Sequence, residues 1–207
     1  ASLLAIRAQP YKPAKQSWLT PQAVPLLILL SAFSWALGIL ASRYPGYVYF
    51  DTADAIISSR TGFTLNSDKH PPLLLWILHA VELFLPLNRV VLSGIAVALI
   101  LVGVLSIWRI AIITVGRERA VLALALCGFV PYLTWVGLRL NHNTLMVALW
   151  PLCVLLFLRC LRKPSVANGC LFGAAAATGV LAKYYLGLLL VSMVMVSFAS
   201  PRRNRFY

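Results

Sequence analysis

The stretch VVLSGIAVALILVGVLSIW, residues 90–108, contains no charged residue and lies between Arg89 and Arg109. A helix needs about 20 apolar residues to cross the hydrocarbon core of a bilayer, so this stretch is long enough to do so. The rest of the 207-residue chain has the same character, because 61% of its residues are hydrophobic and 11% are charged. A soluble domain carries about 25% charged residues. The composition therefore predicts a membrane protein, and residues 90–108 predict one of its spans.

Other apolar runs of similar length predict an all-α, polytopic transmembrane helix bundle of about six spans. The expected crossings are residues 21–42, 90–109, 119–138, 144–161, 168–183 and 185–200. The last two are separated only by Lys183. A single helix over 164–201 would be about 57 Å long, nearly twice the bilayer thickness, so two helices joined near Lys183 are favoured. A single tilted helix of about 28 residues is the alternative.

Residues 71–87 differ from these runs because they are short and contain His79 and Glu82. A carboxylate near the bilayer centre costs several kcal/mol, so we expect an amphipathic helix at the interface that begins at Pro71-Pro72. With this segment outside the membrane and the N-terminus in the cytoplasm, 12 of the 18 Lys and Arg residues are cytoplasmic. If the segment crossed, only 6 would be. The positive-inside rule favours the first arrangement.

This topology divides the chain into three parts. We expect a cytoplasmic tail over 1–20, a transmembrane domain over 21–201 and a basic cytoplasmic end over 202–207. The sequence contains no cleavable signal peptide that we recognise, and we expect the chain to be part of a longer protein. The net charge of +13 does not indicate nucleic-acid binding, because the basic residues are dispersed between apolar runs. The cysteines lie in or beside apolar runs without a C-x-x-C pair, which is typical of packing residues: Cys127, Cys153, Cys160 and Cys170.

The expected outer face collects most of the titratable side chains. Its first loop, residues 43–89, contains Asp51, Asp54, Asp68 and Glu82, which are four of the five acidic residues. Asp51 and Asp54 are three residues apart and share a face if this part is helical, so they can hold a cation or divide the roles of base and ligand. Other polar residues expected on this face are Lys69, His70, His79, Asn141, His142, Asn143 and Lys183. We interpret this concentration as a functional site, and His79 as a packing or interfacial residue.

Six motifs occur in an order that resembles a known enzyme family. They are FDTADA (50–55), SDKHPPLLLWILHA (67–80), PLNRVVLSG (86–94), WRIAIITVGRERAVLALAL (108–126), LNHNTLMVALW (140–150) and GVLAKYYLGLLL (179–190). Together they are similar to the polyprenyl-phosphate-sugar-dependent glycosyltransferases of the GT-C superfamily, in the branch of bacterial protein O-mannosyltransferases and aminoarabinose lipid A transferases. The chain departs from the family at Thr52, where a Glu is common, and at residues 141–143, where an Asp is common.

The resemblance implies a membrane glycosyltransferase of the bacterial inner membrane. It would move a hexose or pentose from a polyprenyl-phosphate donor to a hydroxyl of a lipid, glycan or protein at the outer, periplasmic face, without nucleic acid. Asp51 would be the base, with Asp54 as its partner or alternate. Asp68 would hold His70 or bind a divalent cation, Mg²⁺ or Mn²⁺. The residues expected to bind the substrate or its phosphate are Lys69, His70, Arg89, Asn141, His142, Lys183 and Tyr184, and Arg139 is a further candidate.

Two other classes of function remain as alternatives at this point. A membrane transporter or channel is disfavoured because the chain has no internal repeat and its acidic residues lie in a loop rather than within the spans. The other alternative is a non-catalytic membrane scaffold fragment. The interfacial helix over 71–87 would line the path of the polyprenyl tail in the transferase.

Overall fold

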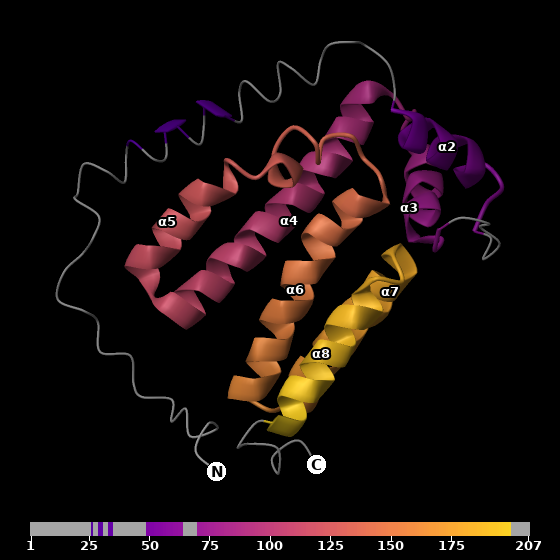
Figure 1. Ribbon diagram of the computed structural model, residues 1–207. Coiled ribbons are helices and arrows are strands. Elements are labelled where there is room, and N and C mark those ends of the chain that lie inside the picture. The colour runs from indigo at the N-terminus through magenta and orange to yellow at the C-terminus, as the bar shows by residue number, and fades with distance from the viewer. Residues whose placement is uncertain (1–25, 27–28, 31–32, 35–48, 64–69, 200–207) are drawn as a thin grey trace.

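The computed structural model describes residues 26, 29–30, 33–34, 49–63 and 70–199 (Figure 1). In this part of the chain there are seven α-helices, one 3₁₀-helix and no strand, which confirms the all-α prediction. The elements are α2 (Phe50–Ser59), α3 (Leu73–Glu82), α4 (Arg89–Val115), α5 (Arg117–Cys127), η1 (Pro131–Leu133), α6 (His142–Arg162), α7 (Val166–Ala182) and α8 (Leu186–Ala199). The expected first crossing over 21–42, except for a few positions, and the two ends at 1–20 and 202–207 lie outside the described residues.

The centre of the fold is the packed pair α4 and α6 (Figure 1). These are the two helices, among the described residues, that are long and apolar enough to cross a membrane, with 27 and 21 residues. They approach closely at Gly103, where a Cβ atom would lie 2.4 Å from the carbonyl oxygen of Val147. By length and composition these two helices are therefore candidate membrane spans, and the expected number of six crossings stays a prediction.

The third expected crossing is wrong in its second half. Helix α5 follows α4 after a turn at Gly116, whose φ of +88° suits a residue without a side chain. It then ends at Cys127 instead of continuing to residue 138. Pro131 explains this early end, because it has no backbone N–H and its ring clashes with the preceding turn of a helix. The chain continues through η1 and an irregular segment to the start of α6.

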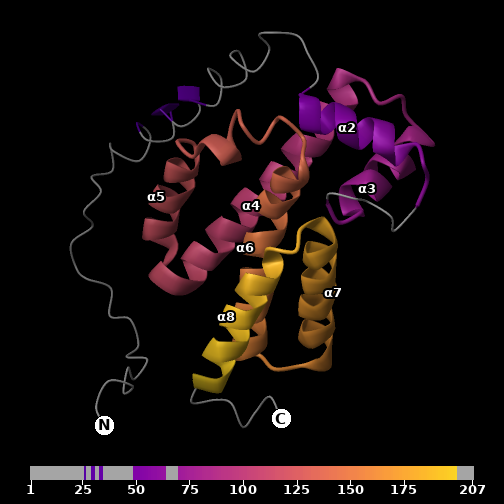
Figure 2. The same ribbon diagram turned by 45° about the vertical axis from the view of Figure 1, so that its right-hand side comes forward.

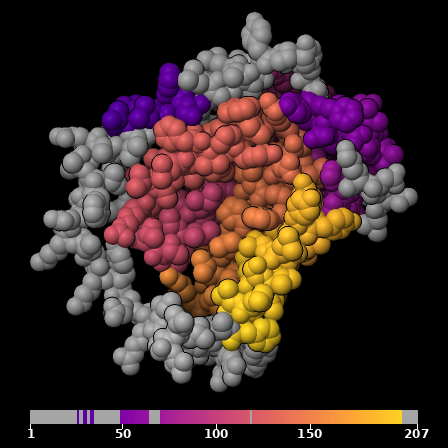
Figure 3. Space-filling view, viewed as in Figure 1, coloured from indigo at the N-terminus to yellow at the C-terminus, as the bar shows by residue number. Residues whose placement is uncertain are grey.

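The break predicted between residues 164 and 201 is confirmed. Helices α7 and α8 form an antiparallel hairpin, with Lys183 in an extended conformation between them (Figure 2). No proline makes this turn. Instead, fully buried Leu186 packs against Gly179, where a Cβ atom would lie 2.3 Å from the Cδ2 atom of Leu186. Space-filling atoms of α8 form one outer face of the bundle (Figure 3), with apolar side chains such as Leu188 and Met195 about two-thirds or more exposed.

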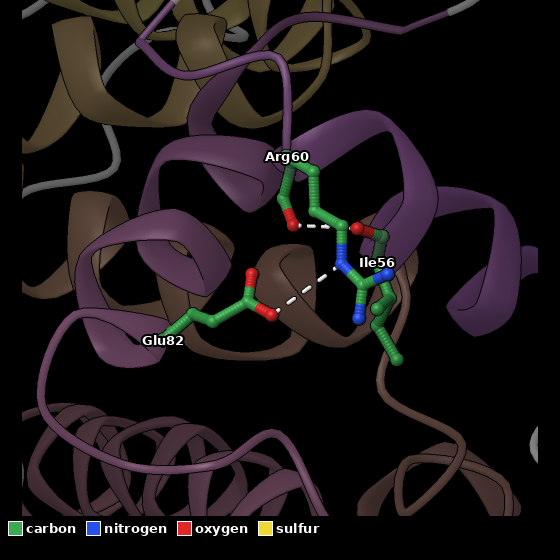
Figure 4. A network of polar contacts seen from close by, with 4 residues as sticks. Ile56, Arg60 and Glu82 are labelled. Atoms are coloured by element: carbon green, nitrogen blue, oxygen red, sulfur yellow. Dashed lines mark hydrogen bonds and ion pairs between the residues drawn. The ribbon is translucent and has the colours of Figure 1, made fainter.

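Helices α2 and α3 lie together at the end of the bundle where α6 begins and α7 ends (Figures 1 and 2). With 10 residues, α3 is about 15 Å long and too short to cross a bilayer, as the sequence predicted for this segment. It anchors the pair through Leu74 and Leu78, which are both fully buried. An ion pair of 3.4 Å between Arg60 and Glu82 joins the C-terminal ends of the two helices (Figure 4).

Candidate functional site

Four separate segments bring polar side chains to one end of the bundle. Helix α2 supplies Asp51, the residues before α3 supply His70, the first turn of α6 supplies His142 and Asn143, and the α7–α8 turn supplies Lys183. We call these five residues the polar cluster. The structure thus brings these five residues to one end of the bundle, and the expectation that they share one face of the membrane stays a prediction.

The start of α6 is fixed by a capping box. The side-chain oxygen of Asn141 accepts hydrogen bonds from the backbone N–H groups of Asn143 at 2.9 Å and Thr144 at 3.1 Å. The Thr144 hydroxyl oxygen in turn accepts the Asn141 backbone N–H. Such a cap satisfies N–H groups that a helix leaves unpaired. Asn141 therefore holds the helix start, which directs His142 and Asn143 into the cluster, and its own contact with a ligand stays a prediction.

His142 is the most buried member of the cluster. Its side chain is 8% exposed, and its ring centroid lies 4.4 Å from that of His70, with the two planes tilted by 44°. Asp51 and Lys183 are also close enough for their charges to act on this ring. Its Nδ1 atom is buried and has no hydrogen-bond partner within the described residues. A buried polar atom left unpaired costs about 1–3 kcal/mol, so this nitrogen is suited to a ligand or a water molecule.

Lys183 contributes a positive charge that no described carboxylate neutralises. Its Nζ atom donates to the side-chain oxygen of Asn143 at 2.5 Å and lies 4.9 Å from the ring centroid of Tyr185. The only ion pair found among the described residues joins Arg60 to Glu82, at another place. An ammonium group has three donors, and Asn143 uses one of them. The half-buried lysine is therefore available to an anion.

Asp51 and Asp54 both lie on α2, three residues apart, and both are exposed. Between them, buried Thr52 donates a hydrogen bond of 2.8 Å from its hydroxyl to the carbonyl of Leu140. This contact fixes α2 to the segment just before α6. Sequence reasoning treated Thr52 only as a departure from the family pattern, whereas here it positions the helix that carries both carboxylates.

Three further residues that the sequence predicted to bind the substrate differ in their contacts and exposure. The guanidinium of Arg139 lies 4.1 Å from the ring centroid of Tyr49 and donates a hydrogen bond to its hydroxyl. Arg89 is the exposed first residue of α4. Tyr184 is 70% exposed, and its neighbour Tyr185 supplies the ring beside Lys183. The sequence alone could not separate these two tyrosines, because the turn geometry decides which ring faces the lysine.

The predicted divalent cation has no ligand set in the part of the chain that the structure describes. Asp68 and Lys69 lie outside the described residues. Within those residues, no group of three or more His, Cys, Asp or Glu side chains is arranged to hold a metal ion. The cation, Mg²⁺ or Mn²⁺, stays a prediction.

The comparison with protein families gives one match. The family described as dolichyl-phosphate-mannose-protein mannosyltransferase matches residues 69–207, which are 139 of the 207 residues. No curated protein and no solved structure matches the chain. The matched region contains four members of the polar cluster, and Asp51 lies before it. The chain thus belongs to the dolichyl-phosphate-mannose-protein mannosyltransferase family, a family of membrane glycosyltransferases.

Proposed function

We propose that this protein transfers a sugar from a polyprenyl-phosphate donor to an acceptor hydroxyl, and that the polar cluster holds the phosphate of the donor. The observation that carries this proposal is the arrangement around Lys183, whose charge is unpaired by the described carboxylates and lies beside a buried imidazole. Family membership supports the glycosyltransferase activity itself.

The cluster suits a phosphate that leaves with the polyprenyl chain. When the bond between the sugar and the phosphate breaks, its electron pair and the developing negative charge go to the phosphate oxygen. A fixed cation beside that oxygen binds the phosphate of the donor and also stabilises the charge that develops there in the transition state. Lys183 supplies the cation, Asn143 orients it, and the paired rings of His70 and His142 line the same end of the bundle.

The acceptor hydroxyl must lose its proton as it attacks the anomeric carbon of the sugar. Asp51 is the proposed general base, because it is the carboxylate of the polar cluster and lies close enough to His142 to act on it electrostatically. In this step the proton passes to the Asp51 carboxylate, the acceptor oxygen forms the new bond to carbon, and the phosphate departs. Asp54, three residues along the same helix, is the alternate or supporting carboxylate.

The apolar surroundings fit a lipid-linked donor. Helix α3, made of LLLWILHAVE, follows directly on His70 and Pro71-Pro72, so a polyprenyl tail can run along it while its phosphate stays at the cluster. The opposite end of the bundle carries the basic turns. The positive-inside rule supports a cytoplasmic location for those turns and, with it, the proposed location of the cluster at the outer, periplasmic face of a bacterial inner membrane. The acceptor is a lipid, glycan or protein hydroxyl, and a divalent cation near Asp68 is part of the proposal.

The test uses the full-length protein in vesicles, with a radiolabelled polyprenyl-phosphate sugar as the probe. Lys183→Ala removes a charged hydrogen bond worth about 1.5–3 kcal/mol, so the KM for the donor should rise about tenfold to a hundredfold. Lys183→Arg should restore part of this loss. Arg117→Ala, which removes one positive charge at the far end of the bundle, is the matched control and should leave this KM unchanged. An unchanged donor KM in Lys183→Ala would overturn the proposed phosphate site.

A further inference from the structure

A second charged feature lies at the opposite end of α6 from the polar cluster. A hollow of about 360 Å³ is lined there by Arg159, Arg162, Lys163 and Asn168, where α6 ends and α7 begins. We call it the basic hollow. The proposed transfer reaction makes no use of it.

The basic hollow is built by specific contacts. Arg162 donates a hydrogen bond of 2.7 Å from Nη2 to the carbonyl of Ile113, which ties it to α4. The side-chain amide of Asn168 donates to the carbonyl of Lys163 at 2.7 Å, and the hydroxyl of Ser165 caps the backbone N–H of Asn168 at 3.2 Å. These bonds fix the turn so that the three cationic side chains face one space.

The positive charge in the hollow exceeds what the helix end requires. Arg159 and Arg162 lie in the last turn of α6, where cations complement the negative end of the helix dipole. Lys163 lies beyond that helix, and the positive N-terminal end of α7 points into the same region. Among the described residues, no carboxylate pairs with any of these three cations. The hollow is therefore complementary to an anion.

The position of the hollow indicates which anion. The 21 residues of α6 span about 30 Å, so the hollow lies one hydrocarbon thickness away from the polar cluster, at the other membrane boundary. Beside it, exposed apolar side chains begin at once on α7, with Val166 85% and Leu171 53% exposed. A lipid with a negatively charged headgroup matches both parts, because its phosphate meets the cations while its acyl chains cover Val166 and Leu171.

We propose that the basic hollow binds the headgroup of an anionic phospholipid in the leaflet opposite the polar cluster. Basic pockets between membrane helices recognise such headgroups, and each nearby Lys or Arg adds to the attraction. The bound lipid would fasten the α6–α7 turn at the membrane boundary. Through Arg162 and Ile113 it would also hold the end of α4.

The experiment measures lipid selectivity of the full-length protein in phosphatidylcholine vesicles, with spin-labelled phosphatidylglycerol and spin-labelled phosphatidylcholine as probes. The unaltered protein should favour phosphatidylglycerol by at least about fivefold. Replacing Arg159, Arg162 and Lys163 together by Gln should lower this preference to near one. The matched control replaces Arg109, Arg117 and Arg119 by Gln, which removes equal charge at the same end but outside the hollow, and should keep the preference.

Three results would overturn the proposal. They are no preference in the unaltered protein, an equal loss in both triple variants, and release of the labelled lipid by millimolar inorganic phosphate, which would identify a soluble anion as the ligand. If the first triple variant does not fold, the double variant of Arg159→Gln and Lys163→Gln replaces it, because it keeps the contact between Arg162 and Ile113. This double variant should lose most of the preference, and full retention would also contradict the proposal.

Discussion

The two ends of α6 differ in how their charged side chains are assembled. At the first end, the members of the polar cluster come from four segments of the chain, with contacts between the rings of His70 and His142 and between Lys183 and Asn143. Lys183 and Asn143 are 40 residues apart, and the bond from Thr52 to Leu140 joins positions 88 residues apart. At the second end, the residues that line the basic hollow all lie between 159 and 168.

This difference fits the two proposed roles, which are sugar transfer at the polar cluster and lipid binding at the basic hollow. A reaction that moves a proton and a phosphate needs groups of different types held in one geometry, and only tertiary contacts between distant segments provide that. A headgroup site needs several like charges near apolar surface, and a single turn can provide these. Mutations that loosen the packing should therefore damage the polar cluster before they damage the basic hollow.

The largest effect should come from the proposed base. Asp51→Asn keeps the size of the side chain but removes its ability to accept a proton, so kcat should fall about 10²–10⁴-fold. The donor KM should change much less, because Lys183 still binds the phosphate. Steady-state transfer with a radiolabelled polyprenyl-phosphate sugar measures both constants.

Asp54→Asn is the matched comparison for this variant. Asp54 would be the base if Asp54→Asn lowered kcat about 10²–10⁴-fold and Asp51→Asn kept near-normal transfer. If both variants are fully active, the carboxylates of α2 have no part in the reaction, and the polar cluster is only a binding site.

The sequence was informative where isolated charges and prolines interrupt apolar runs. Lys183 marked the α7–α8 turn correctly, because a lysine is costly in the middle of an apolar span, and Pro71-Pro72 marked the start of α3. Counting charges predicted that His70, His142 and Lys183 lie on the same side of the membrane. In the structure they lie at one end of the bundle, and the side of the membrane stays a prediction.

The sequence was less informative about where α5 ends and about which side chains contact each other. The absence of charge over 119–138 predicted one helix, yet Pro131 ends α5 early, and this signal was visible in the sequence. By contrast, no pattern indicated that Thr52 bonds to Leu140 or that Tyr185 rather than Tyr184 faces the lysine. Such contacts depend on tertiary packing, which periodicity does not encode.

The second prediction concerns the packing that keeps the two ends of α6 in place. Gly103→Ala would put a Cβ atom 2.4 Å from the carbonyl oxygen of Val147, and that backbone atom cannot move without shifting α6. The unfolding free energy should fall by about 1–3 kcal/mol, as for other overpacked sites. Reversible unfolding in mixed detergent micelles measures it.

Gly94→Ala is its matched control on the same helix. A Cβ atom there would meet nothing within 4 Å, so this substitution should leave stability unchanged or raise it by about 0.5–1 kcal/mol. Equal destabilisation by both substitutions would mean that α4 and α6 do not approach at Gly103.

The third prediction tests the attachment of α2 to the start of α6. Thr52→Val keeps the shape of the side chain but leaves the buried carbonyl of Leu140 without its donor, which should cost about 1–2 kcal/mol. Thr52→Ser should preserve the bond and most of the stability. Because α2 carries Asp51, Thr52→Val should also lower transfer activity, while the lipid selectivity of the basic hollow should not change.

Thr61→Val controls for the loss of a hydroxyl in general. Thr61 is exposed, and its hydroxyl donates to the nearby carbonyl of Ser58 at 2.7 Å, so its loss should change stability by less than about 0.5 kcal/mol. A Thr52→Val variant as stable as Thr61→Val would show that α2 is held by its apolar contacts alone.

The smallest effect should come from the ion pair between Arg60 and Glu82, which joins α2 to α3 at 3.4 Å (Figure 4). The Arg60 side chain is 68% exposed, so solvent screens the pair, and a double-mutant cycle with Arg60→Gln and Glu82→Gln should give a coupling energy of about 0.2–1 kcal/mol. Because the pair joins the C-terminal ends of α2 and α3, whereas Asp51 lies in the first turn of α2, the donor KM should not change in either variant. A coupling well above this range would mean that the ion pair, rather than the buried leucines of α3, holds the two helices together, and the position of Asp51 would then depend on salt concentration.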